Sequence, residues 1–221
     1  MNTDELIAHV SAQIGRLADT YEHGASASDL YEAALLVVAI ASMRAAGATS
    51  VLLTNDGTSA ASEISLRRSP GYLWTPGFTY AVAAFPGTSR TCEAHLGVFV
   101  VGESGVPHEC DVAVLDGREA ERSRRGKIHP RKSGLIAAIE AKHYAASPGI
   151  DIGRAFIGLA SEMGHARSSL AFPAQGATTL MRLLARRSSE CFDSAVPGDA
   201  ATERLGAHIE QTVRNWRARI R

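Results

Sequence analysis

The 221-residue sequence predicts an α/β protein, specifically a three-layer α/β/α sandwich around a central mixed β-sheet. Helical periodicity near both ends of the chain encloses a group of short apolar runs with strand character, and a helix–strand pair follows that group. Helices before and after a strand meander cover both faces of a sheet. The length allows one sizeable core, so we expect a single domain over 1–221, with a core of about 28–173 and additional helices at 3–22 and 200–219.

The first half of the chain begins with two predicted helices. One apolar stripe indicates a helix over 3–22, with Thr3 as its N-cap. The next helix, over 28–46, is apolar all round in its middle and should be deeply buried. Short strands are expected at 51–54 and 78–85, separated by an irregular stretch rich in Pro and Gly.

The second half carries stronger strand signals. Apolar runs at 93–101 and 107–115 are joined by a glycine turn, which predicts a hairpin. Residues 116–134 read as a long polar loop, and 135–142 as the strand that follows it. The remaining elements are expected to be a helix at 150–163, a strand at 168–172 and helices at 178–187 and 200–219.

Bulk composition limits the environment and partners of the protein. The formal net charge is zero, so any attraction to nucleic acid must come from local patches. Cys92, Cys110 and Cys191 are far apart and odd in number, which favours free thiols in a reducing compartment over a disulfide framework. The N-terminus is acidic and no apolar run is long enough to span a bilayer, so we expect a cytoplasmic protein without a membrane partner.

Acidic residues interrupt two of the apolar strands. A carboxylate within a buried strand is costly to desolvate unless it binds a cation or a partner. Strand alternation places Glu140 and Lys142 on one face, and Glu109, Asp111 and Ala113 on one face of the other strand. If the strands are neighbours, Asp111 and Glu140 converge on one ion. Carboxylate oxygens suit Mg²⁺ or Mn²⁺, and the Lys142 ammonium can stabilise an attacking hydroxide or contact a phosphate.

An Asp in one strand, a long excursion and then Glu-x-Lys in the next strand resembles the PD-(D/E)xK nuclease superfamily. Asp111, Glu140 and Lys142 match that motif one for one. The superfamily includes restriction endonucleases and Holliday-junction resolvases, and its core of helix, three-strand meander, helix and strand is the order expected over about 28–173. The resemblance implies a restriction-endonuclease-like fold and a metal-dependent nuclease that hydrolyses phosphodiester bonds, with DNA as the expected substrate and nucleic-acid partner.

The resemblance also implies roles for neighbouring residues. Asp111, Glu140 and the Ala141 backbone carbonyl are the expected ligands of Mg²⁺, for which Mn²⁺ can substitute. Glu32 on the first core helix and Glu109 are auxiliary candidates. The sequence departs from the pattern in two places: Cys110, not Pro, precedes the Asp, and the helix after the motif lacks a glutamine-bearing motif.

The excursion between the motif strands is basic, and the chain must leave one motif strand and return at the other. Lys and Arg there are therefore candidates for phosphate contacts beside the metal, with a solvated, mobile loop as the alternative. The candidate nucleic-acid-binding residues are Arg122, Arg124, Arg125, Lys127, Arg131 and Lys132.

Other interpretations stay open on the sequence alone. Lys142 could form a structural salt bridge with Glu140 or Asp111, since ion pairs occur between neighbouring strands. A non-catalytic nucleic-acid-binding module and a protein that docks a partner subunit or a second copy of itself are the rival functions. His95, His108 and His143 lie near the motif strands and are expected to be structural, because zinc-site spacing is missing.

Overall fold

The computed structural model describes residues 2–143, 146–187 and 189–220. Its strands are β1 (Ser50–Thr54), β2 (Tyr80–Ala84), β3 (Thr91–Val101), β4 (Pro107–Asp116), β5 (Leu135–Ala141), β6 (Ser168–Ala171) and β7 (Glu190–Phe192). Its α-helices are α1 (Thr3–Ile14), α2 (Asp19–Glu22), α3 (Ala27–Ala45), α4 (Gly117–Gly126), α5 (Ile150–Met163), α6 (Thr178–Ala185) and α7 (Ala200–Arg219), with 3₁₀ turns η1 (Lys132–Gly134) and η2 (His165–Arg167).

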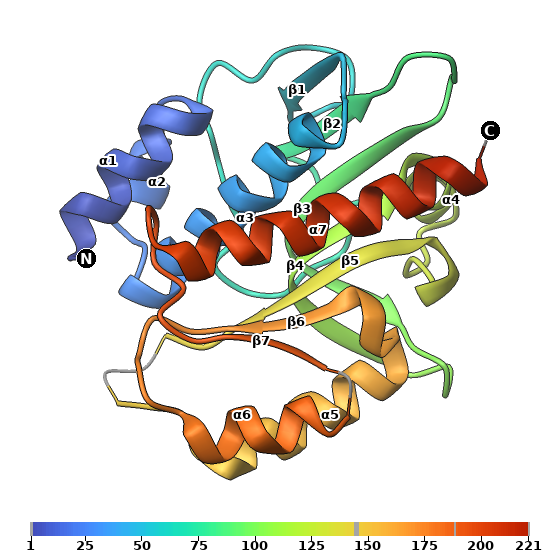
Figure 1. Ribbon diagram of the computed structural model, residues 1–221. Helices are drawn as coiled ribbons and strands as arrows, with labels where there is room; N and C mark the ends of the chain where they lie inside the picture. The colour runs from blue at the N-terminus through green and yellow to red at the C-terminus, as the bar shows by residue number, and fades with distance from the viewer. Residues whose placement is uncertain (1, 144–145, 188, 221) are drawn as a thin grey trace.

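A seven-stranded mixed sheet forms the centre of the molecule, and its strands lie side by side in chain order (Figure 1). Strands β1 to β5 pair antiparallel, whereas β5, β6 and β7 are parallel. The parallel pairs require crossovers, and α5 and α6 supply them. The expected α/β class and the central mixed sheet are therefore confirmed.

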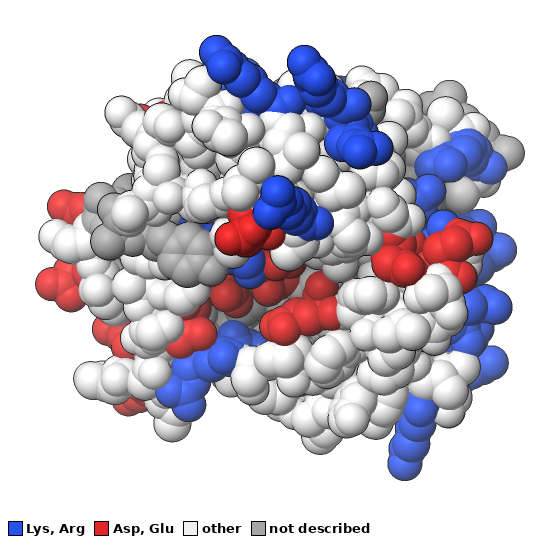
Figure 2. All heavy atoms as spheres, turned by 90° about the horizontal axis from the view of Figure 1, so that it is seen from below, with Lys and Arg blue, Asp and Glu red and all other residues white. Residues whose placement is uncertain are grey.

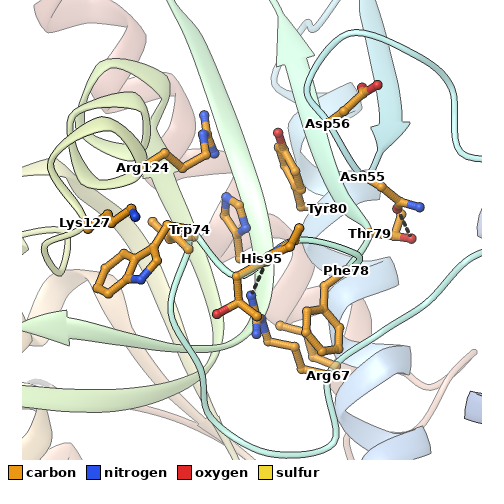
Figure 3. A pocket seen from close by; sticks show the side chains of 14 residues that line it. Asn55, Asp56, Arg67, Trp74, Phe78, Thr79, Tyr80, His95, Arg124 and Lys127 are labelled. Atoms are coloured by element: carbon orange, nitrogen blue, oxygen red, sulfur yellow. Dashed lines mark hydrogen bonds between the residues drawn. The ribbon is translucent and has the colours of Figure 1, made fainter.

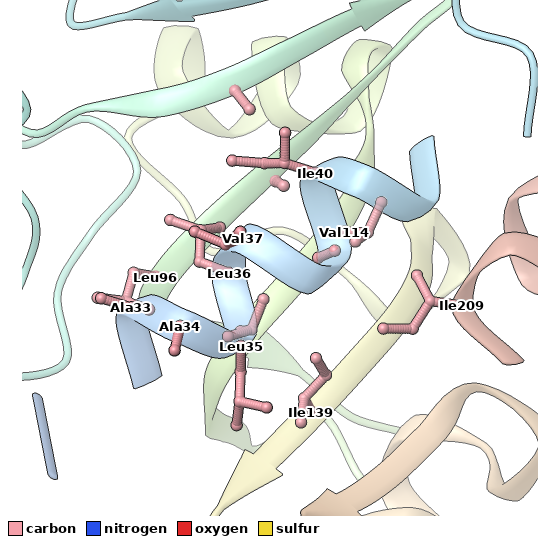
Figure 4. Close-up of a cluster of buried hydrophobic side chains, with 14 of the residues drawn as sticks. Ala33, Ala34, Leu35, Leu36, Val37, Ile40, Leu96, Val114, Ile139 and Ile209 are labelled. Atoms are coloured by element: carbon pink, nitrogen blue, oxygen red, sulfur yellow. The ribbon is translucent and has the colours of Figure 1, made fainter. Parts of the chain in front are cut away.

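Helices cover both faces of the sheet. On one face, α1, α3 and α7 share a core with residues of β2 to β7; Figure 4 shows Leu36 and Ile40 of α3 among Leu96, Val114 and Ile139 of the strands. On the other face, α4 and α5 cover the middle strands and α5 and α6 cover β6. The α3 helix is apolar all round because it lies between the sheet and α1 and α7. Among the described residues, no helix has the length and apolarity needed to cross a membrane.

Local capping explains where two of the N-terminal helices begin. Ser26 caps α3 in a capping box with Asp29. The expected cap of the first helix, Thr3, is wrong: Asn2 caps α1, in a capping box with Glu5. The single helix expected over 3–22 is also interrupted, because Gly15 has φ of 101° and separates α1 from α2.

The expectation of a loop over 116–134 is wrong, since α4 and η1 occupy most of it. The buried positions of α4 include Glu119 and Ser123, so the helix lacks the apolar stripe by which helices are recognised. Arg122 and Arg131 bind the Glu119 carboxylate, and Ser123 donates to the Ile128 carbonyl. The three-residue strand β7 was also not expected.

The β3–β4 hairpin bends where Gly97 lies opposite Asp111. Residues two apart on a strand normally share a face, yet Leu96 packs in the core beneath α3 and Val98 packs in the core beneath α4 and α5. Val112 and Cys110 divide between the two cores in the same way. Gly97 has φ of 56°, a left-handed conformation that glycine adopts without steric cost. The strict alternation expected across Asp111 therefore does not hold, and Asp111 lies at the bend.

Asp116, at the end of β4, fixes the position of two helices. Its carboxylate accepts a hydrogen bond from the Arg118 N–H at the start of α4 (2.9 Å) and one from Trp216 Nε1 on α7 (2.8 Å), and it pairs with Arg90. A buried carboxylate with this number of donors is compensated for its lost hydration. The residue therefore connects helices that lie on opposite faces of the sheet.

Candidate active site

The candidate site lies where β4 and β5 separate. Their regular pairing ends at Val112 and Ile139, and the same register sets Asp111 opposite Glu140. The next backbone donor on β5, the Ala141 N–H, donates to Asp111 Oδ2 at 2.7 Å in place of a backbone carbonyl. The hairpin bend and this hydrogen bond together turn the Asp111 carboxylate toward the end of β5.

Asp111, Glu140 and Lys142 are brought together at this point. Lys142 Nζ lies 2.6 Å from Glu140 Oε1 and 3.9 Å from Asp111 Oδ2. The two carboxylate oxygens are therefore separated by no more than the sum of these distances, on one side of the strands. The side chains of Asp111, Glu140 and Lys142 are 9%, 19% and 26% exposed, so the group is mostly buried and keeps some contact with solvent.

Acidic side chains outnumber basic ones around this group. Burial and the neighbouring Glu140 raise the pKa of Asp111 to about 7. Glu32 on α3 has its pKa raised to about 8 by burial and then by Asp111. Partial burial and Glu140 raise the pKa of Glu109 as well. The charge of Lys142 lowers the pKa of all three acids, but the net shift of each stays upward.

The oxygen atoms at this point suit a hard divalent cation that takes only a few of its ligands from the protein. Asp111 and Glu140 supply carboxylates, and the buried Ala141 lies between the two motif residues of β5. Within the described ranges, no three or more His, Cys, Asp or Glu side chains are arranged to hold a metal ion. Glu32 lies close enough to Asp111 for that carboxyl to raise its pKa, so it stays an auxiliary candidate. Mg²⁺ fits such a site, because it commonly binds through one or two carboxylates and keeps several waters.

The surface of the molecule also carries an acidic hollow. In the view of Figure 2, Asp and Glu side chains gather in the hollowed middle of one face, and most Lys and Arg side chains lie toward its upper and right-hand edges. An acidic hollow of this kind attracts cations and repels the phosphates of nucleic acid unless cations are bound.

The basic residues expected to contact nucleic acid are mostly engaged within the protein. Arg124 binds Glu93 through two hydrogen bonds of 2.7 Å, and Lys132 pairs with Glu103. Arg122 and Arg131 both pair with Glu119, as described for α4. The basic helix α4 also begins at a distance from the candidate site. It follows Asp116, which lies five residues and about 17 Å further along β4 than Asp111.

Arg125 and Lys127 differ from the other four basic residues. Both are exposed at the end of α4, and neither forms an ion pair with another described residue. Lys127 is held in the left-handed conformation, with φ of 48°. These two side chains are therefore the members of the set that are available to an external anion.

A second charged network lies beneath α4 and was not identified from the sequence. Glu93, 4% exposed, binds Arg124 and also His95, whose Nε2 lies 2.9 Å from Glu93 Oε2. The Arg124 and His95 hydrogen bonds outweigh burial and lower the pKa of Glu93 to about 2, while burial lowers the pKa of His95. The Glu93-x-His95 spacing on a strand, equivalent to Glu140-x-Lys142, was the available signal. His108 and His143 contact other residues, Glu162 and Tyr31.

Comparison of this chain with protein-family models, with curated proteins and with solved structures finds no match.

Proposed function

We propose that the protein is a metal-dependent nuclease that hydrolyses phosphodiester bonds, with DNA as the expected substrate. The single observation that carries the proposal is the group of acidic side chains, with Lys142 among them, at the junction of β4 and β5. Four acidic side chains interact there: Asp111, Glu140, Glu32 and Glu109. The Lys142 ammonium is the cation that partly offsets their charge. Such a site is stabilised by a divalent cation, because buried carboxylates require a compensating charge.

The order of elements supports a restriction-endonuclease-like core. Helix α3 is followed along the chain by the β3–β4–β5 meander, by α5 and by β6, which pairs parallel to β5. This is the order that the PD-(D/E)xK resemblance implies, with β1 and β2 inserted after α3. Asp111 falls on the second strand of the meander and Glu140 on the third, and Lys142 directly follows the third strand.

In this proposal each residue has a separate task. Asp111, Glu140 and the Ala141 carbonyl would hold Mg²⁺, which would supply Lewis acidity and neutralise phosphate charge when bound. The Lys142 ammonium, adjacent to both carboxylates, stabilises the hydroxide that forms as the attacking water loses its proton and donates a hydrogen bond to a phosphate oxygen. The attacking water passes one proton to solvent, its oxygen forms a bond to phosphorus as the bond to the leaving sugar oxygen breaks, and that sugar oxygen takes a proton from solvent. The Ala141 N–H orients the Asp111 carboxylate throughout.

Plasmid cleavage in Mg²⁺, and separately in Mn²⁺, tests the proposal. Asp111→Asn retains an oxygen for the Ala141 N–H, and Lys142→Met retains the apolar stem, so both variants should fold. We expect each to lose cleavage by at least about a hundredfold, the scale of losing a group that stabilises transition-state charge. Asp151→Asn, whose side chain is 89% exposed on α5, is the matched control and should cleave normally. Full activity of a folded Asp111→Asn or Lys142→Met protein would contradict the assignment.

A non-catalytic module on the same fold is the second candidate. The 2.6 Å contact between Lys142 and Glu140 favours it, because that ion pair satisfies two of the charges without a metal. This function predicts that the protein retards the mobility of DNA and that the binding weakens as salt rises. It also predicts no cleavage products in Mg²⁺ or Mn²⁺. If neither cleavage nor DNA binding is measured, a partner-docking role is favoured, and light scattering should then detect a stable assembly.

A further inference from the structure

A pocket of about 270 Å³ lies beside the Glu93–His95–Arg124 network, between β2, β3, the end of α4 and the segment before β2. Figure 3 shows His95 and Tyr80 in its middle, Trp74 and Lys127 on one side and Arg67 below. It shares no lining residue with the Asp111 site. Its volume is close to the lower end of the range for small-molecule sites, about 300 Å³, so it is large enough for one small ligand.

The charge in this pocket is positive on balance, because Arg67, Arg124 and Lys127 line it against one acid, Asp56, whose carboxylate accepts hydrogen bonds from the backbone N–H groups of Thr58 and Ser59. Arg124 is neutralised by Glu93, but among the described residues neither Arg67 nor Lys127 forms an ion pair. Arg67 is only 8% exposed and directs hydrogen bonds to the carbonyls of Tyr72 (2.8 Å) and Thr75 (3.4 Å), which carry no formal charge. A buried guanidinium without a carboxylate partner favours binding of an anion.

The walls of the pocket are aromatic and fixed in position. Trp74 is stacked on Tyr72 with centroids 4.6 Å apart, and Tyr80 is stacked on His95 at 4.7 Å. The Arg67 guanidinium lies 4.1 Å from the centroid of the Phe78 ring. Ring faces held in this way bind planar groups at little entropic cost, and base–aromatic stacking contributes about 1–3 kcal/mol per base.

We propose that this pocket binds one nucleotide unit, with its base against the aromatic walls and its phosphate between Arg67 and Lys127. Flat aromatic surfaces combined with two cations that form no ion pair, against the single carboxylate of Asp56, match the base and the phosphate of a nucleotide. The unit could come from a free mononucleotide or from the 5′-phosphorylated end of a single strand, which share this chemistry. The inference does not depend on hydrolysis at Asp111, because the two sites use different residues.

The test is calorimetric titration with AMP in EDTA, which removes divalent metal and with it the proposed nuclease activity. Adenosine and inorganic phosphate, each lacking half of the ligand, should bind at least about tenfold more weakly than AMP. Lys127→Asn removes a cation while keeping a residue that tolerates the left-handed conformation, and Trp74→Leu removes the ring. Both should weaken AMP binding by about tenfold or more, as expected for a lost charge-assisted hydrogen bond or stacking contact.

Arg118→Gln is the matched control, because it removes an exposed cation from the same helix outside the pocket. It should leave AMP binding unchanged. A 5′-phosphorylated oligothymidine that displaces AMP supports the strand end as the ligand source, and failure to displace bound AMP supports the free nucleotide. Absence of binding by both AMP and the oligonucleotide overturns the proposal. Equal weakening by Lys127→Asn and Arg118→Gln, or unchanged binding by Trp74→Leu, overturns it as well.

Discussion

Replacing Arg124 with methionine should destabilise the protein far more than a surface substitution does. Arg124→Met retains the length of the side chain but leaves Glu93 buried without its bidentate partner. The pKa of Glu93 falls from its ordinary 4.5 to about 2, which corresponds to about 3 kcal/mol at 1.36 kcal/mol per unit. Removing one partner of a buried pair typically costs about 3–5 kcal/mol, the same range.

Urea unfolding at pH 7 measures this loss. Arg125→Met, an exposed neighbour on the same helix, serves as the control and should change stability by less than about 0.5 kcal/mol. The double variant Glu93→Gln/Arg124→Met should be more stable than Arg124→Met alone, because it removes the orphaned charge. A loss of less than about 1 kcal/mol in Arg124→Met would refute the view that this arginine is part of the folded core.

The pH dependence gives a second measurement of the same interaction. Because the folded-state pKa of Glu93 lies below the unfolded value, the unfolded chain binds more protons between pH 4.5 and 2. The stabilisation is fully present above about pH 4.5 and is lost as the pH falls toward 2. In Arg124→Met, burial without the guanidinium should raise the pKa of Glu93, so the stability difference between the two proteins should shrink in acid.

Two further predictions concern backbone geometry. Gly97→Ala should lose about 1–2 kcal/mol in urea unfolding, because φ is 56° and the new Cβ would lie 3.3 Å from the Ser69 carbonyl. Any plasmid cleavage should fall with it if the bend orients Asp111, and an unchanged unfolding midpoint would remove the argument for strain there. Ser26→Ala should lose about 1 kcal/mol, because it removes the side-chain acceptor of the Asp29 N–H at the start of α3, and a thermal scan against Ser28→Ala checks this.

Local sequence signals were sufficient for several elements. The apolar periodicities predicted α5 over 150–163 and α7 over 200–219, and those bounds are confirmed. Strand alternation, a property of two residues on one strand, also predicted that Glu140 and Lys142 share a face, and their 2.6 Å contact confirms it. These features depend on interactions between residues close in sequence, so the pattern alone determines them.

Other features depend on contacts between distant segments and could not be predicted from the chain. Helix α4 buries Glu119 and Ser123, and only partners elsewhere in the fold make those polar positions acceptable. The basic excursion appeared free to bind nucleic acid, but Glu93, 31 residues before Arg124, engages one of its arginines. Sequence determined which strands carry acids; the tertiary structure decided which charges are compensated, because desolvation and pairing are set by neighbours from the whole chain.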